Sequence, residues 1–180
     1  MDYYIVFAGV IEQNFCNKLL NAINNAVNLG ATKIFLLFSS LGGNTQEGFT
    51  LATIIRNSKV PILIHATNNI DSIANVIYLS AKERSAESYA KFFLHGTNTS
   101  GTFDEKSLNE QLLAVKTETT RIAYYISENS NLNLSDVQDM MNKGTSISAQ
   151  QALQYGIVQT INHLDVPQTG VLREDIVVIN

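Results

Sequence analysis

The order of apolar and polar positions predicts a chain in which short strands alternate with helices. Residues 3–8 (YYIVFA) form an apolar run of strand length. Residues 14–29 carry apolar side chains at helical spacing, and Gly30 follows in the usual position after a helix end. Residues 33–39 (KIFLLFS) are almost continuously apolar, which is typical of a parallel strand buried on both faces. This first segment therefore predicts a β-α-β unit.

The same alternation continues towards the C-terminus. Asn44 and Glu47 have the spacing of a capping box, which predicts a helix running to about Asn57. Apolar residues from Leu108 to Ile126 recur at the 3.6-residue period and predict one long helix over residues 104–129. The remaining elements are shorter: strands over residues 60–66, 89–95 and 156–161, a helix over residues 72–81, and capped helix starts at Ser135 (with Gln138) and Ser148 (with Gln151).

Alternating strands and helices favour one α/β fold. Such units build a mainly parallel sheet covered by helices, with right-handed crossovers. The chain has only two prolines among its 180 residues, and no low-complexity stretch separates one part from another. We therefore expect a single domain over residues 1–180.

Composition narrows the class of protein. Twelve Lys and Arg residues against sixteen Asp and Glu give a formal charge of −4, which argues against a nucleic-acid partner. The one cysteine, Cys16, excludes an intramolecular disulfide framework and a cluster of zinc-binding thiolates. Residues 1–10 lack the basic segment of a signal peptide, and the apolar runs are too short to span a bilayer. We expect a cytoplasmic protein with no membrane association, no metal and no cofactor.

The first candidate functional segment is the Gly-Gly loop after the strand over residues 33–39. Gly42 and Gly43 would let backbone N–H groups approach a ligand, and the helix that follows favours negative charge at its N-terminus. This loop is therefore a candidate oxyanion or anion site. The alternative is that the two glycines only make a tight turn.

The second and third candidates are a serine and a histidine at the ends of later strands. Ser72 could be a nucleophile, with the N–H group of Ile73 binding the oxyanion of the transition state. The alternative is that Ser72 or Asp71 simply caps a helix. His95 could accept a proton from a serine, or could be only a partly exposed polar side chain. His65, inside a strand, and His163, near a loop, have less support.

Taken together, these loops resemble the proteolytic subunit of the Clp protease, within the crotonase-like superfamily. The resemblance covers residues 4–161. Residues 34–43 (IFLLFSSLGG) resemble the family's strand ending in Ser-Pro-Gly-Gly, with Leu41 in place of the proline. Ser72 falls at the family's nucleophilic serine, and His95, in the sequence FFLHG, falls at its general base. Residues 146–158 (SISAQQALQYGIV) resemble the family's Ser-Ala-x-Glu-Ala-x-x-Tyr-Gly-Leu-Val segment.

The resemblance implies a fold and a reaction. The fold would be a crotonase-like ββα superhelix with a mainly parallel sheet and a long handle helix over residues 104–129. The activity would be that of a serine endopeptidase acting on peptides or unfolded proteins. Ser72 would attack the scissile carbonyl, His95 would act as general base and then general acid, and the N–H groups of Gly43 and Ile73 would hold the oxyanion. Residues 96–102 would pair with the peptide backbone, and the chain would form a homo-oligomeric ring.

The sequence also departs from the family. Asp71 places a negative charge beside Ser72, where the family has Gly-x-Ala-Ala-Ser-Met. Gly144 and Thr145 stand where the third triad residue is expected, and no carboxylate lies within four positions of Gly144. The family's N-terminal axial segment is largely missing, so an ATPase unfoldase partner is not favoured.

These departures leave two alternatives open. The first is a catalytically inert Clp-like subunit that assembles with itself or with an active paralogue. The second is an acyl-CoA enzyme of the crotonase type, although residues after 161 give no sign of the C-terminal helices that complete a CoA site.

Overall fold

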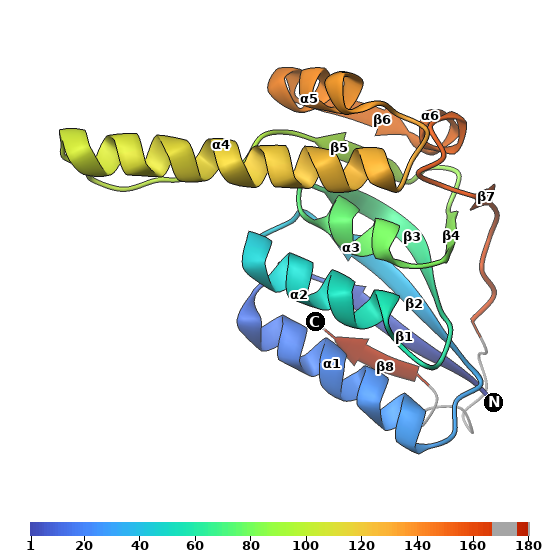
Figure 1. The fold of residues 1–180 in the computed structure, drawn as a ribbon. Coiled ribbons are helices and arrows are strands. Elements are labelled where there is room, and N and C mark those ends of the chain that lie inside the picture. Colours follow the sequence, from blue (N-terminus) through green and yellow to red (C-terminus); the bar gives the residue numbers. More distant parts are fainter. Residues whose placement is uncertain (167–175, 180) are drawn as a thin grey trace.

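The computed structural model describes residues 1–166 and 176–179, and it has an α/β fold (Figure 1). Its sheet has eight strands in the order β6-β5-β3-β2-β1-β8, while β4 pairs with β3 and β7 beside this path. The strands are β1 (Asp2–Ala8), β2 (Lys33–Ser40), β3 (Ile62–Asp71), β4 (Glu83–Ala86), β5 (Lys91–Leu94), β6 (Thr145–Ser148), β7 (Thr160–Ile161) and β8 (Ile176–Ile179). The helices are α1 (Gln13–Asn28), α2 (Thr45–Arg56), α3 (Ala74–Ser80), α4 (Glu105–Glu128), α5 (Leu134–Lys143) and α6 (Ala149–Gln154). The expected single domain includes residues 167–175 and 180, which lie outside the described residues.

The sheet is mainly parallel, as its sequence pattern predicts. Parallel pairing joins β1 to β2, β2 to β3, and β3 to both β4 and β5, whereas β5 and β6 are antiparallel. Helices α1, α2 and α3 lie side by side over one face of the sheet (Figure 1). The core lies between these helices and the inward-facing side chains of the strands, among them Phe7, Phe38 and Ile64.

The prediction that residues 33–39 are buried on both faces is wrong. Side chains along β2 alternate between fully buried and half-buried, so only the face under the helices is closed off completely. The half-buried face is still apolar, and the ring of Phe35 stacks on that of Tyr4 with 4.9 Å between the centroids. The apolar run of residues 33–39 therefore combines two faces of β2: one packs in the core, and the other is apolar but only partly covered.

The largest difference from the predicted elements is in β3. The sequence predicts a strand that stops at Ala66 and a loop from Thr67, but the strand continues to Asp71. Its first half pairs with β4 and its second half with β5, and its register against β2 shifts between Phe38 and Ser40. Asn68 and Asn69 are poor strand formers, so local propensity concealed a strand that tertiary pairing imposes.

Smaller corrections concern helix starts and short strands. Asn133, not Ser135, caps α5, and its side chain accepts from the N–H of Asp136. The strand predicted over residues 89–95 covers only Lys91–Leu94, and the one predicted over 156–161 covers only Thr160–Ile161. Strands β4 and β6, which have four residues each, were not predicted from the sequence. The capping box at Ser148 and Gln151 is confirmed.

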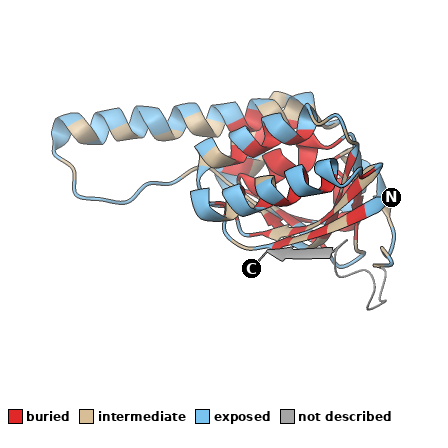
Figure 2. Cartoon of the chain, turned by 90° about the horizontal axis from the view of Figure 1, so that it is seen from below, coloured by how far each residue is buried: buried red, intermediate tan, exposed pale blue. Residues whose placement is uncertain are grey.

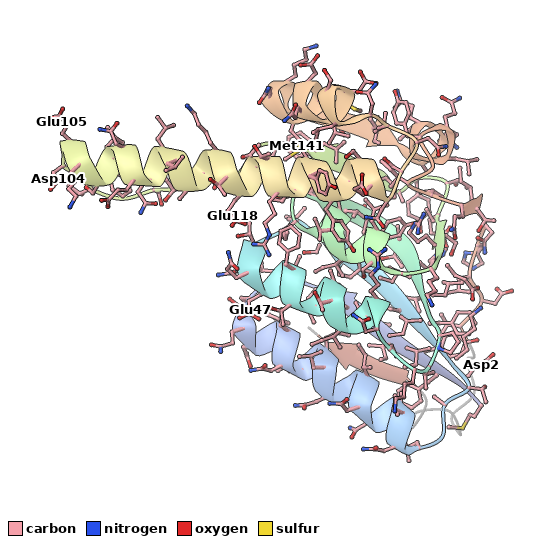
Figure 3. All side chains as sticks on the ribbon, viewed as in Figure 1. Asp2, Glu47, Asp104, Glu105, Glu118 and Met141 are labelled. Atoms are coloured by element: carbon pink, nitrogen blue, oxygen red, sulfur yellow. The ribbon has the colours of Figure 1, made fainter. Side chains whose placement is uncertain are left out.

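Helix α4 is the long helix that the sequence predicts, but only its C-terminal part is packed. Its buried residues are Ile122, Ala123 and Ile126, and its first half projects beyond the body of the molecule (Figures 1 and 2). Asp104 and Glu105 mark the free end, where a capping box between Asp104 and Ser107 closes the first turn (Figure 3). Leu108, Leu112 and Leu113 are therefore exposed rather than part of a buried stripe.

Two histidines share one carboxylate beside β4. The Nε2 atom of buried His65 lies 3.3 Å from Oε1 of Glu87, and the Nδ1 atom of exposed His163 lies 2.9 Å from the same oxygen. With Nε2 carrying the proton, Nδ1 of His65 accepts from the hydroxyl of Ser85 at 2.8 Å. Burial lowers the pKa of His65 and outweighs Glu87, which acts to raise it. Burial acts to raise the pKa of Glu87, but hydrogen bonds from His163 and His65 lower it overall.

This arrangement predicts acid sensitivity. Because the folded protein protonates His65 less readily than the unfolded chain does, the free energy of unfolding should fall as the pH is lowered from about 7.5 to about 5.5. The contribution of Glu87, whose pKa is also lowered, has the same sign: it is present above the ordinary pKa range of glutamate and is lost only at a pH below this window. Thermal melts across the window should show a weaker pH dependence for His65→Gln than for the wild type. His163→Gln is the control that leaves His65 in place, and parallel curves for all three proteins would contradict the prediction.

Candidate active site

Ser72 stands on a strained turn between a strand and a helix. It follows β3 directly, and it is the one non-glycine residue with a positive φ, 58°, within residues 1–166 and 176–179. A backbone of this kind is costly for a residue with a Cβ and is concentrated at functional sites, where serine nucleophiles are carried on sharp strand-to-helix turns. The strain therefore points to a role for Ser72 beyond packing.

The capping interpretation of this segment is wrong. Helix α3 begins at Ala74, its N-cap position is Ile73, and no side chain caps it. Ser72 and Asp71 precede the cap position. The Oδ1 atom of Asp71 is buried and has no hydrogen-bond partner among the described residues.

Asn75 holds the turn, and nothing in the sequence reasoning singled it out. Its fully buried amide nitrogen lies 3.0–3.1 Å from the carbonyl oxygens of Ile70, Ser72 and Phe93, to which it donates. The N–H of Ser72 also donates to the carbonyl of Phe93 at 2.9 Å. The sequence signal that could have singled out Asn75 is its position as a lone amide side chain within an apolar helical segment. A buried polar side chain of this kind needs hydrogen-bond partners. Asn75 thus ties β3, the turn and β5 together.

The Gly-Gly loop lies against this turn. A Cβ atom added at Gly42, whose φ is 96°, would lie 2.7 Å from Cβ of Ser72 and 3.0 Å from the carbonyl oxygen of Asp71. Only glycine permits so close an approach. The loop is fixed by hydrogen bonds from the N–H of Ile11 to the carbonyl of Gly42 and from the N–H of Asn44 to the carbonyl of Ile11. The structure therefore brings together Gly42, Gly43 and Ser72, which the sequence places far apart.

Two backbone donors in this region are unused. Among the described residues, the N–H groups of Gly43 and Ile73 have no hydrogen-bond acceptor. The side chain of Ile73 is fully buried against Gly48 of α2, where an added Cβ would overlap it. This packing fixes the start of α3. Gly43 is exposed, so its N–H group is open to a ligand oxygen as an oxyanion hole requires, whereas Ile73 as a whole is buried.

His95 lies just beyond β5 with its ring held in one tautomer. Its Nδ1 atom lies 2.7 Å from the carbonyl oxygen of Gly96, and a carbonyl only accepts, so Nδ1 carries the proton. A neutral ring then has its lone pair on Nε2, which is the state of a general base. The ring stacks on that of Phe93 with 4.9 Å between the centroids. No hydrogen bond joins the side chains of Ser72 and His95 in the part of the chain that the structure describes.

The position of the expected third triad residue lies close to His95 but carries no acid. Leu94 pairs with Thr145, and an added Cβ at Gly144 would lie 3.6 Å from the ring of Phe93, at ordinary contact distance. Gly144 ends α5 with a φ of 66°. The hydroxyl of Thr145 donates to the carbonyl of Met140 instead of reaching His95. The backbone thus leaves room for a carboxylate that the sequence does not supply.

A groove opens beside His95, between the segment that follows it and two helices. Its volume is about 640 Å³, and Gly96, Thr97, the middle of α4 and the end of α5 line it. Met141, at the junction of α5 and α4, forms part of it (Figure 3). The N–H of Gly96 donates to the carbonyl of Met141, and that of Thr97 to the hydroxyl of Thr119. These two donors are therefore not free to pair with a peptide, and the edge expected over residues 96–102 is open only beyond Thr97.

Other candidate nucleophiles are closed off. Burial raises the pKa of the Cys16 thiol to about 11, so it is not a thiolate at neutral pH. Ser40 and Ser80 are buried; the hydroxyl of Ser40 accepts from the N–H of Gly42, and that of Ser80 donates to the carbonyl of Ile77. Within the described residues, no three His, Cys, Asp or Glu side chains gather where they could hold a metal ion. No helix there has the length and apolar character needed to cross a bilayer.

Comparison with known proteins identifies the family. The family model of the Clp protease matches residues 2–164. The chain belongs to the Clp protease family. Among curated Clp proteins, the ATP-dependent Clp protease proteolytic subunit 2 of Treponema denticola is 25% identical over 170 residues, which cover 91% of this chain and 84% of that protein.

A solved Clp structure has the same fold. An Asn-to-Asp mutant of ClpP1 from Listeria monocytogenes superposes with a TM-score of 0.81, covering 90% of this chain and 92% of its own, at 18% identity. This likeness confirms the α/β Clp-type fold with a mainly parallel sheet and a long helix α4.

Proposed function

We propose that this protein is a Clp-like serine endopeptidase with Ser72 as its nucleophile. The observation that carries the proposal is the strained φ of Ser72 at the end of β3, held by Asn75 and contacted by Gly42. Nothing in the packing of α3 needs a strained serine there. A nucleophile on such a turn presents its hydroxyl to a substrate while the next N–H faces the developing oxyanion.

The remaining groups take the roles that the geometry supports. Ser72 Oγ attacks the carbonyl carbon of a peptide bond, and Nε2 of His95 takes the hydroxyl proton and later gives it to the leaving amine. The N–H groups of Gly43 and Ile73 hold the oxyanion. The groove beside His95 is wide enough for a side chain of the peptide or unfolded-protein substrate.

Reaction with an active-site probe tests this proposal. A fluorophosphonate or a β-lactone should modify the protein covalently, and peptide mapping by mass spectrometry should place the label on Ser72. Ser80→Ala, which removes a buried hydroxyl from the same helix region, should be labelled as well as the wild type. A label on another serine, or none under conditions that modify an active serine peptidase, would refute the assignment.

A specific observation favours a second candidate function. Among the described residues, no hydrogen bond joins Nε2 of His95 to Ser72, and no acid stands at position 144, which is a glycine. A Ser-His pair without an orienting acid is a weaker catalyst. The alternative is therefore a catalytically inert subunit of the same fold, and absence of labelling with an intact fold would support it. The acyl-CoA alternative gains no such support.

The exposed half of α4 leads us to propose a homo-oligomer, as a ring. Leu112 and Leu113 are 50% and 67% exposed on a helix that projects from the body, and apolar surface of this kind needs a partner. Multi-angle light scattering should give a mass several times the 19.8 kDa of one chain. A double variant, Leu112→Glu with Leu113→Glu, should lower that mass while Lys106→Gln, on the same exposed half, should not. A wild-type protein that stays monomeric at micromolar concentration would contradict the proposal.

A further inference from the structure

We infer that Asp71 stabilises the positive charge that forms on His95 during catalysis, in place of the absent triad acid. The inference rests on the proposed function. It assigns Asp71 as a positioning residue that acts through His95 and does not touch the substrate.

The register of the sheet places Asp71 and His95 on the same face. Asp71 pairs with Phe93 in the parallel ladder of β3 and β5, and side chains of directly paired residues point to the same face. The ring of Phe93 stacks on the ring of His95 with an interplanar angle of 28°. The side chains of Asp71, Phe93 and His95 therefore share one face of the sheet, opposite the face of buried Ile70 and Phe92.

The state of the Asp71 carboxylate points to a missing charged partner. Its Oδ1 atom is buried and no hydrogen-bond donor reaches it among the described residues. Burial raises the pKa of Asp71, while the charges of Lys91 and His95 lower it. Lys91 makes no ion pair within 4.0 Å in the described part of the chain. A buried carboxylate oxygen without a donor is unfavourable unless another state of the site satisfies it.

The reaction supplies a positive charge on the same face of the sheet, which stabilises the Asp71 carboxylate by charge and not by a hydrogen bond, because Nδ1–H of His95 stays bonded to Gly96. When Ser72 Oγ forms its bond to the carbonyl carbon, its proton moves to Nε2 of His95 and the ring becomes an imidazolium. The carbonyl of Gly96 fixes the Nδ1 tautomer but carries no full charge to offset that cation. Asp71 stays ionised and offsets it, and the interaction ends when the proton passes to the leaving amine. Lys91, the other charged group interacting with Asp71, has the wrong sign to help His95.

Asp71 has a second, opposing effect, which makes the test decisive. Its negative charge also repels the oxyanion that forms next to Ser72. If repulsion prevails, Asp71→Asn speeds the reaction; if attraction to His95 prevails, Asp71→Asn slows it. The inference requires the second result.

The experiment measures the rate of fluorophosphonate labelling of Ser72 as a function of pH. We expect Asp71→Asn to lower the maximal rate by about tenfold or more and to move the acidic limb of the profile to lower pH. Asp71→Glu should recover part of the rate, and Glu128→Gln, an exposed acid on α4, should match the wild type. A rate for Asp71→Asn equal to or above that of the wild type would overturn the inference.

A carboxylate added at Gly144 provides a second arm. Asp tolerates a positive φ better than most residues, and a Cβ at Gly144 finds ordinary contacts. Adding Gly144→Asp to the Asp71→Asn variant should raise its labelling rate by a larger factor than adding Gly144→Asp to the wild type. The reason is that Asp71 already supplies a negative charge to His95 in the wild type. Gly144→Asn is the matched control without charge. An equal gain in both backgrounds would show that Asp71 does not serve His95.

A third readout separates this inference from the proposed function. The NMR titration of the His95 ring can be followed whether or not the protein turns over. Asp71→Asn should move its midpoint to lower pH. If the wild type is not labelled but the midpoint moves, the proposed function fails and the Asp71–His95 coupling stands; if the midpoint does not move, the inference fails.

Discussion

Replacing Ser72 with alanine is expected to abolish covalent labelling and peptide hydrolysis while leaving the melting temperature nearly unchanged. The hydroxyl is the only group removed, and because the effects of triad residues are not additive, loss of the nucleophile from a site without the triad acid should lower turnover by about 10²-fold or more, to the background rate. Probe labelling read by in-gel fluorescence and hydrolysis of a fluorogenic peptide measure the two losses. Hydrolysis that survives in Ser72→Ala would assign the reaction to another residue.

Ser72→Gly sharpens this prediction because it separates activity from stability. Glycine adopts a positive φ without the cost that a Cβ carries, so this variant should be more stable than the wild type by about 1 kcal/mol, yet unreactive. A residue that is kept for packing would lose stability on truncation. Urea denaturation of the wild type, Ser72→Ala and Ser72→Gly should therefore rank the glycine variant first.

Asn75→Ala is expected to have the largest combined effect on fold and reactivity. It leaves the carbonyl oxygens of Ile70, Ser72 and Phe93 without the amide that they share, inside a buried region. The expected loss is about 2–4 kcal/mol of unfolding free energy, since unsatisfied buried groups bear their full desolvation cost. Labelling of Ser72 should fall at least about tenfold in the fraction that remains folded, because the turn can relax.

The control for Asn75 lies on the same helix. Ser80 is equally enclosed, but its hydroxyl bonds to Ile77 within its own helix and does not touch the turn. Ser80→Ala should cost about 1 kcal/mol and leave the labelling rate of the folded protein unchanged. If Asn75→Ala lowered stability but labelled as fast as the wild type, the amide would have no part in holding the nucleophile.

The fold was largely predictable because most elements have a clear internal period. Helix α1 and helix α4 appear within a residue or two of their predicted bounds, since their apolar spacing and caps are local signals. The second half of β3 and the four-residue strands β4 and β6 were not predictable in this way. Asn69 is a strand residue because β5 offers it a partner, Lys91, and a short local sequence does not record its neighbours.

The candidate site was predictable in its residue types but not in its connections. Ser72, His95 and the Gly-Gly loop stand out by their positions after strands. The positive φ of Ser72, the clamp made by Asn75 and the bond from His95 to Gly96 depend on groups 3–18 residues away or on backbone geometry. In the sequence Asp71 was only a departure from the family pattern, and the register of β3 against β5 is what pairs it with Phe93, whose ring stacks on that of His95.

The continuation of β3 through Asp71 limits how this protein can change in length. Residues 67–71 read as a loop, and loops normally accept insertions and deletions. Asn69, Ile70 and Asp71 are successive steps of the ladder with β5, and their side chains alternate between two faces, so adding or removing one of them would turn Asp71 inward and Ile70 outward. Homologous chains should therefore keep the number of residues from Asn69 to Ser72, and changes in length should fall at residues 67–68, where the register against β2 shifts.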